Sequence, residues 1–382
     1  MPPCLPRETG IRPRVAPEPN GGALAFQTRP WRRGHRLSGV SSQSGYRIHK
    51  WDADPVWETF DLPAPGPDDV TVRVEACGVG LTVLNAIRGD LGSDPSLLPR
   101  VPGHELVGIV TGAGSGVDLG LVGHRVVAYF YLTCGACPEC RAGQDSLCRN
   151  VSGYVGVHRD GGYAPFVVLP AANVIPVPDD LDPISATVVP DAVATPVHVA
   201  ARAGLGRDDR VVVIGAGGGV GIHMVQVARL ETADVVGLDV TRQKLNAVEA
   251  VGARAIDSSD FSSLPLLFSD GPPTAVIDFV GSAATAAWAL DCLAPSGRLV
   301  ALTTFVDRLI PMDYRNLVFR ETAVLGSRYA TKAEVATAGD LVATGTVKPM
   351  IGRVVGPVDL LPMHEALRTK QLVGRGALTW DA

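Results

Sequence analysis

A glycine-rich turn between two apolar segments constrains the fold of this 382-residue chain more than any other feature. The apolar run 210–214 leads into Gly215-Ala-Gly-Gly-Gly-Val-Gly221, and a helical pattern follows over 220–230. Such a turn lets backbone amides approach a pyrophosphate, and the N-terminus of the next helix favours the anion. The consensus Gly-x-Gly-x-x-Gly fits only with Ala216, Gly218 and Gly221 at its small positions. We therefore predict a dinucleotide-binding turn whose binding residues are Gly215, Ala216, Gly218, Gly219, Val220 and Gly221.

An acidic residue after the next apolar run indicates which dinucleotide binds. Asp239 follows the run 234–238 and lies 18 residues past Gly221. A carboxylate in this place can bind both hydroxyls of the adenosine ribose and repels a 2′-phosphate. The sequence therefore predicts NAD rather than NADP. A second role for Asp239, compatible with the first, is to cap the helix predicted to begin at Thr241.

Strands alternate with helices after the glycine turn. Strand patterns at 274–278 and 298–302 accompany helical patterns at 241–251, 283–293 and 331–344. This alternation predicts βαβ units and a doubly wound parallel sheet. Upstream of the turn, short strands dominate, as in 69–75, 105–111 and 125–130. We therefore expect an α/β fold with a second, β-rich domain.

Four of the seven cysteines lie within fifteen residues, at Cys134, Cys137, Cys140 and Cys148. Four thiolates in the spacing C-x2-C-x2-C-x7-C can surround one tetrahedral zinc ion and leave no open position, which predicts a structural metal. An iron–sulfur ferredoxin motif has a shorter last gap and a proline after its fourth cysteine, and this segment has neither. Four free buried cysteines are the remaining alternative. A metal site in place of disulfides indicates a reducing compartment, and we expect a cytoplasmic protein.

Composition excludes several classes of partner. The net charge of −5 argues against a broad nucleic-acid-binding surface. The best candidate for a membrane span, 211–228, contains five glycines and a histidine, so we expect no membrane partner.

Residues 1–44 are rich in Pro, Arg, Gly and Ser and do not form a signal peptide. We predict a disordered tail or an over-extended start there; a basic tail that binds an acidic partner is the alternative.

Taken in order along the chain, these motifs resemble the zinc-containing alcohol dehydrogenase family of the medium-chain dehydrogenases/reductases. The resemblance covers about 46–382 and rests on the cysteine cluster, the glycine turn with Asp239, and three short motifs: Cys77-Gly-Val-Gly-Leu-Thr82, Gly103-His-Glu105 and Asp278-Phe-Val-Gly281. It implies a Rossmann domain inserted in a GroES-like catalytic domain. The implied segments are 45–190 (catalytic, with the zinc lobe at 134–148), 191–345 (Rossmann) and 346–382 (return to the catalytic domain).

The resemblance also implies an activity. The family transfers hydride between NAD(H) and a small alcohol, aldehyde or ketone in the cleft between the two domains, and its members are homodimers or homotetramers. By residue-for-residue correspondence, Thr82 passes a proton and Thr195 contacts the nicotinamide. Lys244 contacts the adenosine ribose, and Arg375 reaches the pyrophosphate.

The metal-binding motif departs from the family pattern. The family has Cys-Gly-Val-Cys-His-Thr, and its second cysteine binds a catalytic zinc ion; here Gly80 stands in that position. The remaining family ligands are His104 and Asp191, and Glu105 is a further hard donor beside them. These residues either hold a zinc ion with water completing the shell, or are polar groups hydrogen-bonded inside the cleft.

Three functions follow from these alternatives. The first is alcohol–carbonyl oxidoreduction with an atypical catalytic zinc. The second is a reductase of activated C=C or C=O bonds without a catalytic zinc. The third is a dinucleotide-binding regulatory protein that has lost catalysis.

Overall fold

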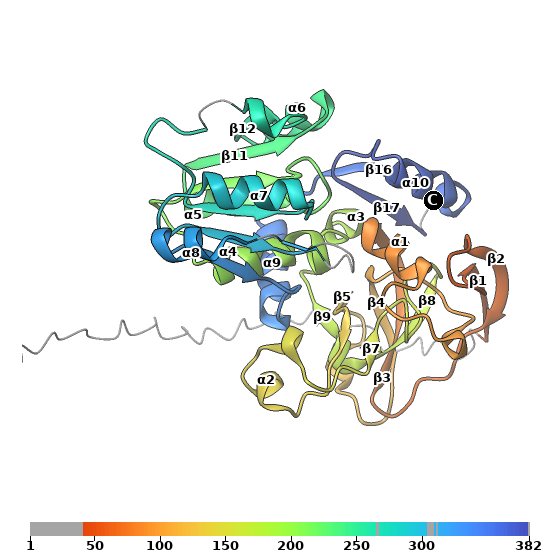
Figure 1. Ribbon diagram of the computed structural model, residues 1–382. Coiled ribbons are helices and arrows are strands. Elements are labelled where there is room, and N and C mark those ends of the chain that lie inside the picture. The colour runs from red at the N-terminus through yellow and green to blue at the C-terminus, as the bar shows by residue number, and fades with distance from the viewer. Residues whose placement is uncertain (1–40, 265–266, 304–308, 311, 381–382) are drawn as a thin grey trace, which may run out of the picture. The chain divides into compact units, whose positions relative to one another are not determined.

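The computed structural model describes residues 41–264, 267–303, 309–310 and 312–380, which form two large sheets and two small ones (Figure 1). One large sheet has six strands, all parallel, in the order β12-β11-β10-β13-β14-β15. Its strands are β10 (Arg210–Ile214), β11 (Asp234–Asp239), β12 (Arg254–Asp257), β13 (Ala275–Asp278), β14 (Arg298–Ala301) and β15 (Ala323–Gly326). The strand order reverses between β10 and β13, which makes the end of β10 the switch point where such sheets bind ligands.

Helices cover both faces of this sheet (Figure 1). The side chains of β10 alternate: Val211 and Val213 belong to the core shared with α4, α5 and α9, while Val212 and Ile214 belong to the core shared with α7. Burial on both faces explains why β10 is an unbroken apolar run. The helices are α4 (Ala194–Ala203), α5 (Gly221–Glu231), α6 (Arg242–Ala250), α7 (Ala283–Cys292) and α9 (Lys332–Ala343). The predicted doubly wound parallel sheet is confirmed.

The other large sheet joins distant parts of the chain. Its order is β16-β17-β3-β4-β5-β9, with β8 also paired to β3. Its strands are β3 (Asp69–Val79), β4 (Glu105–Ala113), β5 (Arg125–Ala128), β8 (Phe166–Pro170), β9 (Val174–Pro176), β16 (Ile351–Val355) and β17 (Arg375–Thr379). The antiparallel pairing of β17 with β3 sets Leu378 opposite Cys77 and brings the C-terminal segment to the first motif of the chain. The inserted arrangement expected for the Rossmann sheet is therefore confirmed, while the exact domain limits 45–190, 191–345 and 346–382 stay predictions.

The first 44 residues require a correction. Strand β1 (Ser42–Arg47) pairs with β2 (Val56–Asp61), so ordered structure begins before residue 45. The side chain of Gln43 adds two hydrogen bonds, donating to the carbonyl of Phe166 and accepting from its amide, at 3.0 and 2.8 Å. These hydrogen bonds join the start of β1 to β8, more than 120 residues away, although the sequence around residue 43 shows no strand pattern. The rest of the predicted tail, 1–40, lies outside the described residues.

The remaining elements are short, apart from one helical stretch. Residues Pro183–Ala203 combine α3 (Pro183–Ala186), a π-helical turn (Val189–Val193) and α4. By length and composition this stretch could cross a membrane, but 67% of it is buried in the molecule, as in the core helix of a soluble protein. The other elements are α1 (Leu81–Arg88), α2 (Pro138–Arg141), α8 (Tyr314–Arg320), α10 (Leu360–Arg368), the strands β6 (Tyr131–Leu132) and β7 (Gly153–Tyr154), and 3-10 turns at Pro95–Leu97, Leu119–Leu121, Asp145–Leu147, Ala171–Asn173, Phe261–Ser263 and Pro357–Asp359.

Candidate active site

The glycine turn lies at the switch point of the parallel sheet. It leaves β10 at Gly215, whose φ of +78° is a left-handed conformation that favours glycine. The turn then enters α5 at Gly221, so the amides at the start of this eleven-residue helix lie beside the switch point. The six predicted dinucleotide residues, 215–216 and 218–221, are all in this turn.

Asp239 is part of the same structure. Its carboxylate accepts hydrogen bonds from the backbone amides of Gly217 at 2.9 Å and Val240 at 2.8 Å, and Lys244 Nζ lies 3.9 Å from it. The end of β11 and the first turn of α6 thereby bring Asp239 and Lys244 to the glycine turn, as an adenosine-ribose site requires. The second role considered for Asp239 is wrong, because the N-cap of α6 is Thr241 itself.

A buried ionic cluster occupies the place of the predicted catalytic metal. The Arg375 guanidinium donates from Nε to Glu105 Oε2 at 2.8 Å and from Nη2 to Asp191 Oδ2 at 2.7 Å, and Nη2 is also paired with Glu105 Oε1. Arg375 is 4% exposed and Glu105 is fully buried. Burial lowers the pKa of Arg375 to about 10, so the guanidinium stays charged at neutral pH.

Each member of the cluster is placed by a different element. Glu105 begins β4, Asp191 lies in the π-helical turn before α4, and Arg375 begins β17. A π-helical turn interrupts the regular side-chain spacing of a helix and is frequent at functional sites. Thr195, one turn later, donates to the second oxygen of Asp191 at 2.8 Å and so orients that carboxylate.

His104 completes the cluster, and its ring has a free nitrogen. Nε2 lies 3.6 Å from Glu105 Oε1 and 4.0 Å from Asp191 Oδ2, and it makes no hydrogen bond within the described residues. The ring packs against Phe130 at a centroid distance of 4.5 Å. Burial holds the pKa of His104 below its usual value, which favours the neutral ring.

The donors of His104, Glu105 and Asp191 lie within 4.8 Å of one another, close enough for a metal ion. Two of these donors, Glu105 and Asp191, are however already paired with Arg375. A Cβ atom added to Gly80 would lie only 2.5 Å from Nη1 and 2.7 Å from Nη2 of the guanidinium, so the family's cysteine would require the guanidinium to move. The residues present do not fit a catalytic zinc ion as they stand.

Arg375 also borders the glycine turn. A Cβ atom added to Gly219 would lie 3.0 Å from both Cδ and Nη1 of Arg375. The adjoining Gly374 donates its amide to the carbonyl of Gly217 at 3.2 Å. The dinucleotide turn and the ionic cluster are therefore two sides of one site, with Arg375 between them.

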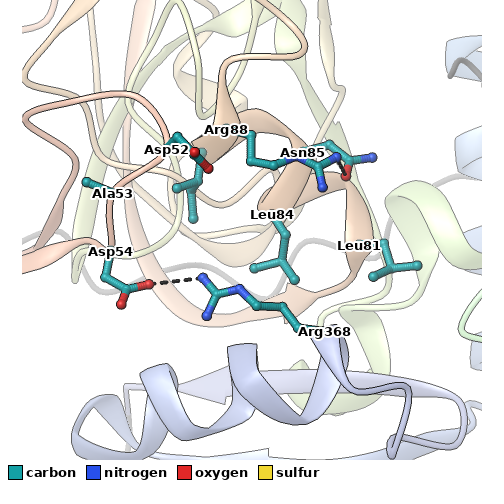
Figure 2. Close-up of a pocket in the computed structure, with 9 residues that line it drawn as sticks. Asp52, Ala53, Asp54, Leu81, Leu84, Asn85, Arg88 and Arg368 are labelled. Atoms are coloured by element: carbon teal, nitrogen blue, oxygen red, sulfur yellow. Dashed lines mark hydrogen bonds and ion pairs between the residues drawn. The ribbon is translucent and has the colours of Figure 1, made fainter. Parts of the chain in front are cut away.

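Thr82 lies near this site in the chain, and a pocket opens beside it. The residue is half-buried on α1, two positions after Gly80, and its hydroxyl bonds to no other described side chain. The pocket, of about 530 Å³, is shown in Figure 2, where Leu81, Asn85 and Arg88 project from α1. Across the pocket, Arg368 from α10 pairs with Asp54 at 2.9 Å. None of the predicted site residues lines this pocket, but its lining includes Leu81, which lies between Gly80 and Thr82 in the sequence.

The four cysteines form a second candidate metal site. Their sulfur atoms lie within 4.8 Å of one another, although Cys148 follows Cys134 by 14 residues and Cys140 by eight residues in the sequence. The backbone amides of Cys137 and Cys134 donate to sulfur atoms of the group, at 3.3 and 3.4 Å, and backbone hydrogen bonds lower the pKa of Cys134 to about 6. No disulfide joins any of the six described cysteines. This donor set fits a tetrahedral zinc ion closed to substrate.

Comparisons with known proteins agree with the geometry. A family model described as the alcohol dehydrogenase GroES-like domain matches residues 66–179, and a model described as zinc-binding dehydrogenase matches 219–344. An alcohol dehydrogenase of Geobacillus stearothermophilus is 31% identical over 295 residues, which cover 74% of this chain and 83% of that protein. The chain belongs to the zinc-containing alcohol dehydrogenase family of the medium-chain dehydrogenases/reductases.

Two further similarities concern relatives of this dehydrogenase. An acryloyl-coenzyme A reductase of Metallosphaera sedula is 29% identical, with 83% of this chain and 94% of that protein covered. A zinc-binding dehydrogenase structure from Sinorhizobium meliloti, bound to NADP, is 29% identical with a TM-score of 0.79, covering 89% of this chain and 99% of the other. This chain is therefore an oxidoreductase of that family, and one similar solved structure is bound to NADP.

Reasoning from the sequence missed the partners of Arg375 in this dehydrogenase. Arg375 was predicted to reach a pyrophosphate, and Glu105 and Asp191 to stand near a metal; the structure brings all three together. The available signal was Gly80, the residue whose missing side chain makes room for the guanidinium. Gly217, whose amide binds Asp239, was also absent from the predicted set.

Proposed function

We propose that this dehydrogenase uses NAD(H) to interconvert an alcohol and its aldehyde or ketone. The observation that carries the proposal is the position of Arg375 between the glycine turn and the polar cluster, because a dinucleotide on the turn would extend toward His104 and Asp191. Hydride then passes between carbon 4 of the nicotinamide and the substrate carbon. The dehydrogenases among the relatives support this reaction class.

The preference for NAD is part of the proposal. Asp239 is 6% exposed and held by two backbone amides at the turn, so its carboxylate is fixed where the adenosine ribose would bind. A fixed negative charge favours two ribose hydroxyls and disfavours a 2′-phosphate. A similar structure is bound to NADP, and we propose that Asp239 is the residue that disfavours this cofactor in the present chain.

The chain's own residues supply proton transfer and orientation. The Thr82 hydroxyl is free to bond a substrate oxygen and to pass its proton toward solvent. His104 Nε2 is a buried nitrogen without a partner among the described residues, and a substrate oxygen would satisfy it. Thr195 and Arg375 hold the Asp191 carboxylate in one orientation beside this nitrogen.

A second reaction is favoured by one observation. Gly80 removes the thiolate that a catalytic zinc ion needs, and a substrate whose double bond is conjugated to a carbonyl needs less polarisation. In this reaction hydride is added to the β-carbon and a proton to the α-carbon of an enone or enoyl thioester, and NADH becomes NAD. The similarity to acryloyl-coenzyme A reductase supports it as the alternative.

One isotope experiment tests both reactions. The purified chain is incubated with NADH in which both hydrogens of carbon 4 are deuterium and, in separate reactions, aldehydes, ketones, enones and enoyl thioesters, and the products are analysed by mass spectrometry. Deuterium on the carbinol carbon supports alcohol–carbonyl interconversion, and deuterium on the β-carbon supports the alternative. Absence of deuterium from every product, with NADH bound, would contradict an oxidoreductase role at this site.

Metal binding, assembly and compartment complete the proposal. We propose that Cys134, Cys137, Cys140 and Cys148 hold one structural zinc ion.

We also propose a homodimer, because α8 exposes Tyr314, Val318 and Phe319 close in sequence to the edge strand β15. The free thiols of the described chain fit a reducing compartment such as the cytoplasm.

A further inference from the structure

We propose that the Arg375 guanidinium replaces the catalytic metal ion in this chain and excludes a divalent ion from the cluster of His104, Glu105 and Asp191. The inference rests on the proposed function only for identifying this cluster as the active site. Its test, the number of metal ions that the protein binds, does not depend on turnover.

Arg375 offsets one of the two carboxylate charges of the cluster and contacts both carboxylates. Two carboxylates lie in the interior, with Glu105 fully buried and Asp191 14% exposed, and one guanidinium reaches both. The planar, multiply donating guanidinium suits this task, because it satisfies oxygens of two carboxylates at once. A zinc ion could enter only if Arg375 left, and both carboxylates would then lose their present partner.

The backbone holds Arg375 in this position. Its amide donates to Met350 at 2.8 Å, and the preceding Gly374 has a φ of +67° and bonds the glycine turn. The side chain passes between Gly219 on one side and Gly80 on the other. Neither wall carries a Cβ atom, so the guanidinium lies in a slot formed by two glycines.

Gly80 stands where the family has a cysteine ligand, and the space left by its missing side chain is next to the Arg375 guanidinium. Any side chain at position 80 would overlap the guanidinium, since its Cβ atom would lie 2.5 Å from Nη1. A cysteine at this position would therefore force the guanidinium, the flexible end of the Arg375 side chain, to move. Gly80 therefore removes the thiolate ligand and also leaves the space in which the guanidinium lies.

The test counts zinc ions per chain by elemental analysis, after dialysis against a small excess of zinc and then metal-free buffer. The wild-type chain should hold one zinc ion, bound by the four cysteines, both with and without NADH. Arg375→Gln removes the cation from the two carboxylates, and Gly80→Cys adds a thiolate while displacing the guanidinium. At least one of these variants should hold a second zinc ion, and Cys137→Ser in the wild-type background should lower the count toward zero.

Several results would overturn the inference. Two zinc ions in the wild-type chain would show that Arg375 does not exclude the metal. One zinc ion in both variants, when each is folded by circular dichroism, would show that Arg375 is not what keeps the metal out. Where neither variant folds, titration of the wild-type chain with Co²⁺ decides: a second equivalent of cobalt absorbance contradicts the inference, and saturation at one equivalent supports it.

The same samples separate this inference from the proposed function. NADH binding is followed by fluorescence, and deuterium transfer by the isotope experiment. A wild-type chain with two zinc ions that still transfers deuterium overturns only the inference. A chain with one zinc ion that neither binds NADH nor transfers deuterium overturns the proposed function and leaves the role of Arg375 intact.

Discussion

At the residue scale, the chemistry of the site depends on a few charged groups at close range. Arg375, Glu105 and Asp191 contact one another, and the Nε2 atom of His104 makes no hydrogen bond within the described residues. Asp239 forms a separate set with the glycine turn. Because these sets do not share side chains, cofactor choice and proton transfer can be tested by separate substitutions.

Asp239→Asn tests the cofactor preference. The amide oxygen can still accept from Gly217, but the negative charge that repels a 2′-phosphate is lost. We expect the ratio of kcat/KM for NADH over NADPH to fall by on the order of tenfold. Asp257→Asn, at the end of the neighbouring strand β12, where the carboxylate accepts hydrogen bonds from Ser259, is the matched control. An unchanged ratio in Asp239→Asn would show that another residue makes the choice.

Thr82→Val tests the proton-transfer role. Valine has nearly the shape of threonine without the hydroxyl, so cofactor binding should stay the same. We expect kcat for the alcohol or carbonyl substrate to fall about 100-fold, and Thr82→Ser to restore most of it. Steady-state kinetics with the NADH dissociation constant measured alongside is the assay, and full activity in Thr82→Val would exclude this hydroxyl from the reaction.

At the element scale, local patterns predicted the strands and helices of the Rossmann sheet well. The run 210–214 is β10, and the predicted helices at 220–230 and 331–344 differ from α5 and α9 by one residue at each end. The elements not predicted, such as β8, β9 and β15, are short and depend on pairing with distant strands. Period-two and helical patterns identify an element only where one face is regularly buried.

The cysteine lobe is an element whose stability we expect to depend on metal. Its only helix, α2, has four residues, so little secondary structure holds the lobe without an ion. Chelation, or Cys137→Ser, should lower the melting temperature by at least about 5 °C and expose 134–148 to proteolysis. Cys292→Ser, outside the lobe, is the control. An unchanged melting temperature after verified loss of zinc would contradict a structural role.

On helix α5, the side chain of His223 contributes to the stability of the folded chain in a way that depends on pH. Burial lowers the pKa of His223 to about 4, and the neutral ring bonds the carbonyl of Gly219 at 2.7 Å and the amide of Met350 at 3.0 Å. The unfolded chain takes up this proton near pH 6.5 and the folded chain only near pH 4, so the contribution is present above pH 6.5 and is lost as pH falls toward 4. Its size is on the order of 3 kcal/mol.

The measurement is the melting temperature at pH 7 and at pH 5. His223→Gln removes the titrating group, so its melting temperature should fall less between these pH values than that of the wild-type chain. His124→Gln, at a half-exposed position paired with Asp179, should behave as the wild type does. An equal fall in all three would show that other groups dominate the acid sensitivity.

At the scale of the whole molecule, we expect the exposed apolar side chains of α8 to form the interface of a homodimer. Tyr314, Val318 and Phe319 are 79, 70 and 76% exposed, and β15, close to them in sequence, is the last strand in the described order of its sheet. We expect Phe319→Asp to convert a dimer to a monomer in sedimentation velocity at micromolar concentration. Leu119→Asp, equally exposed elsewhere in the chain, should leave the dimer intact. A dimer that persists in Phe319→Asp would place the interface on another surface.

The sequence by itself determined the features whose residues are close together in the chain. The glycine turn with its strand and helix, the acidic end of β11 and the four-cysteine lobe are local patterns, and their chemistry follows from spacing alone. Only the tertiary structure decided what lies in the catalytic position. The pairing of β17 with β3 carries Arg375 to Gly80, nearly 300 residues away, and no local pattern encodes that contact. Because long-range strand pairing sets which charges meet, the cation of this site could be identified only in the folded chain.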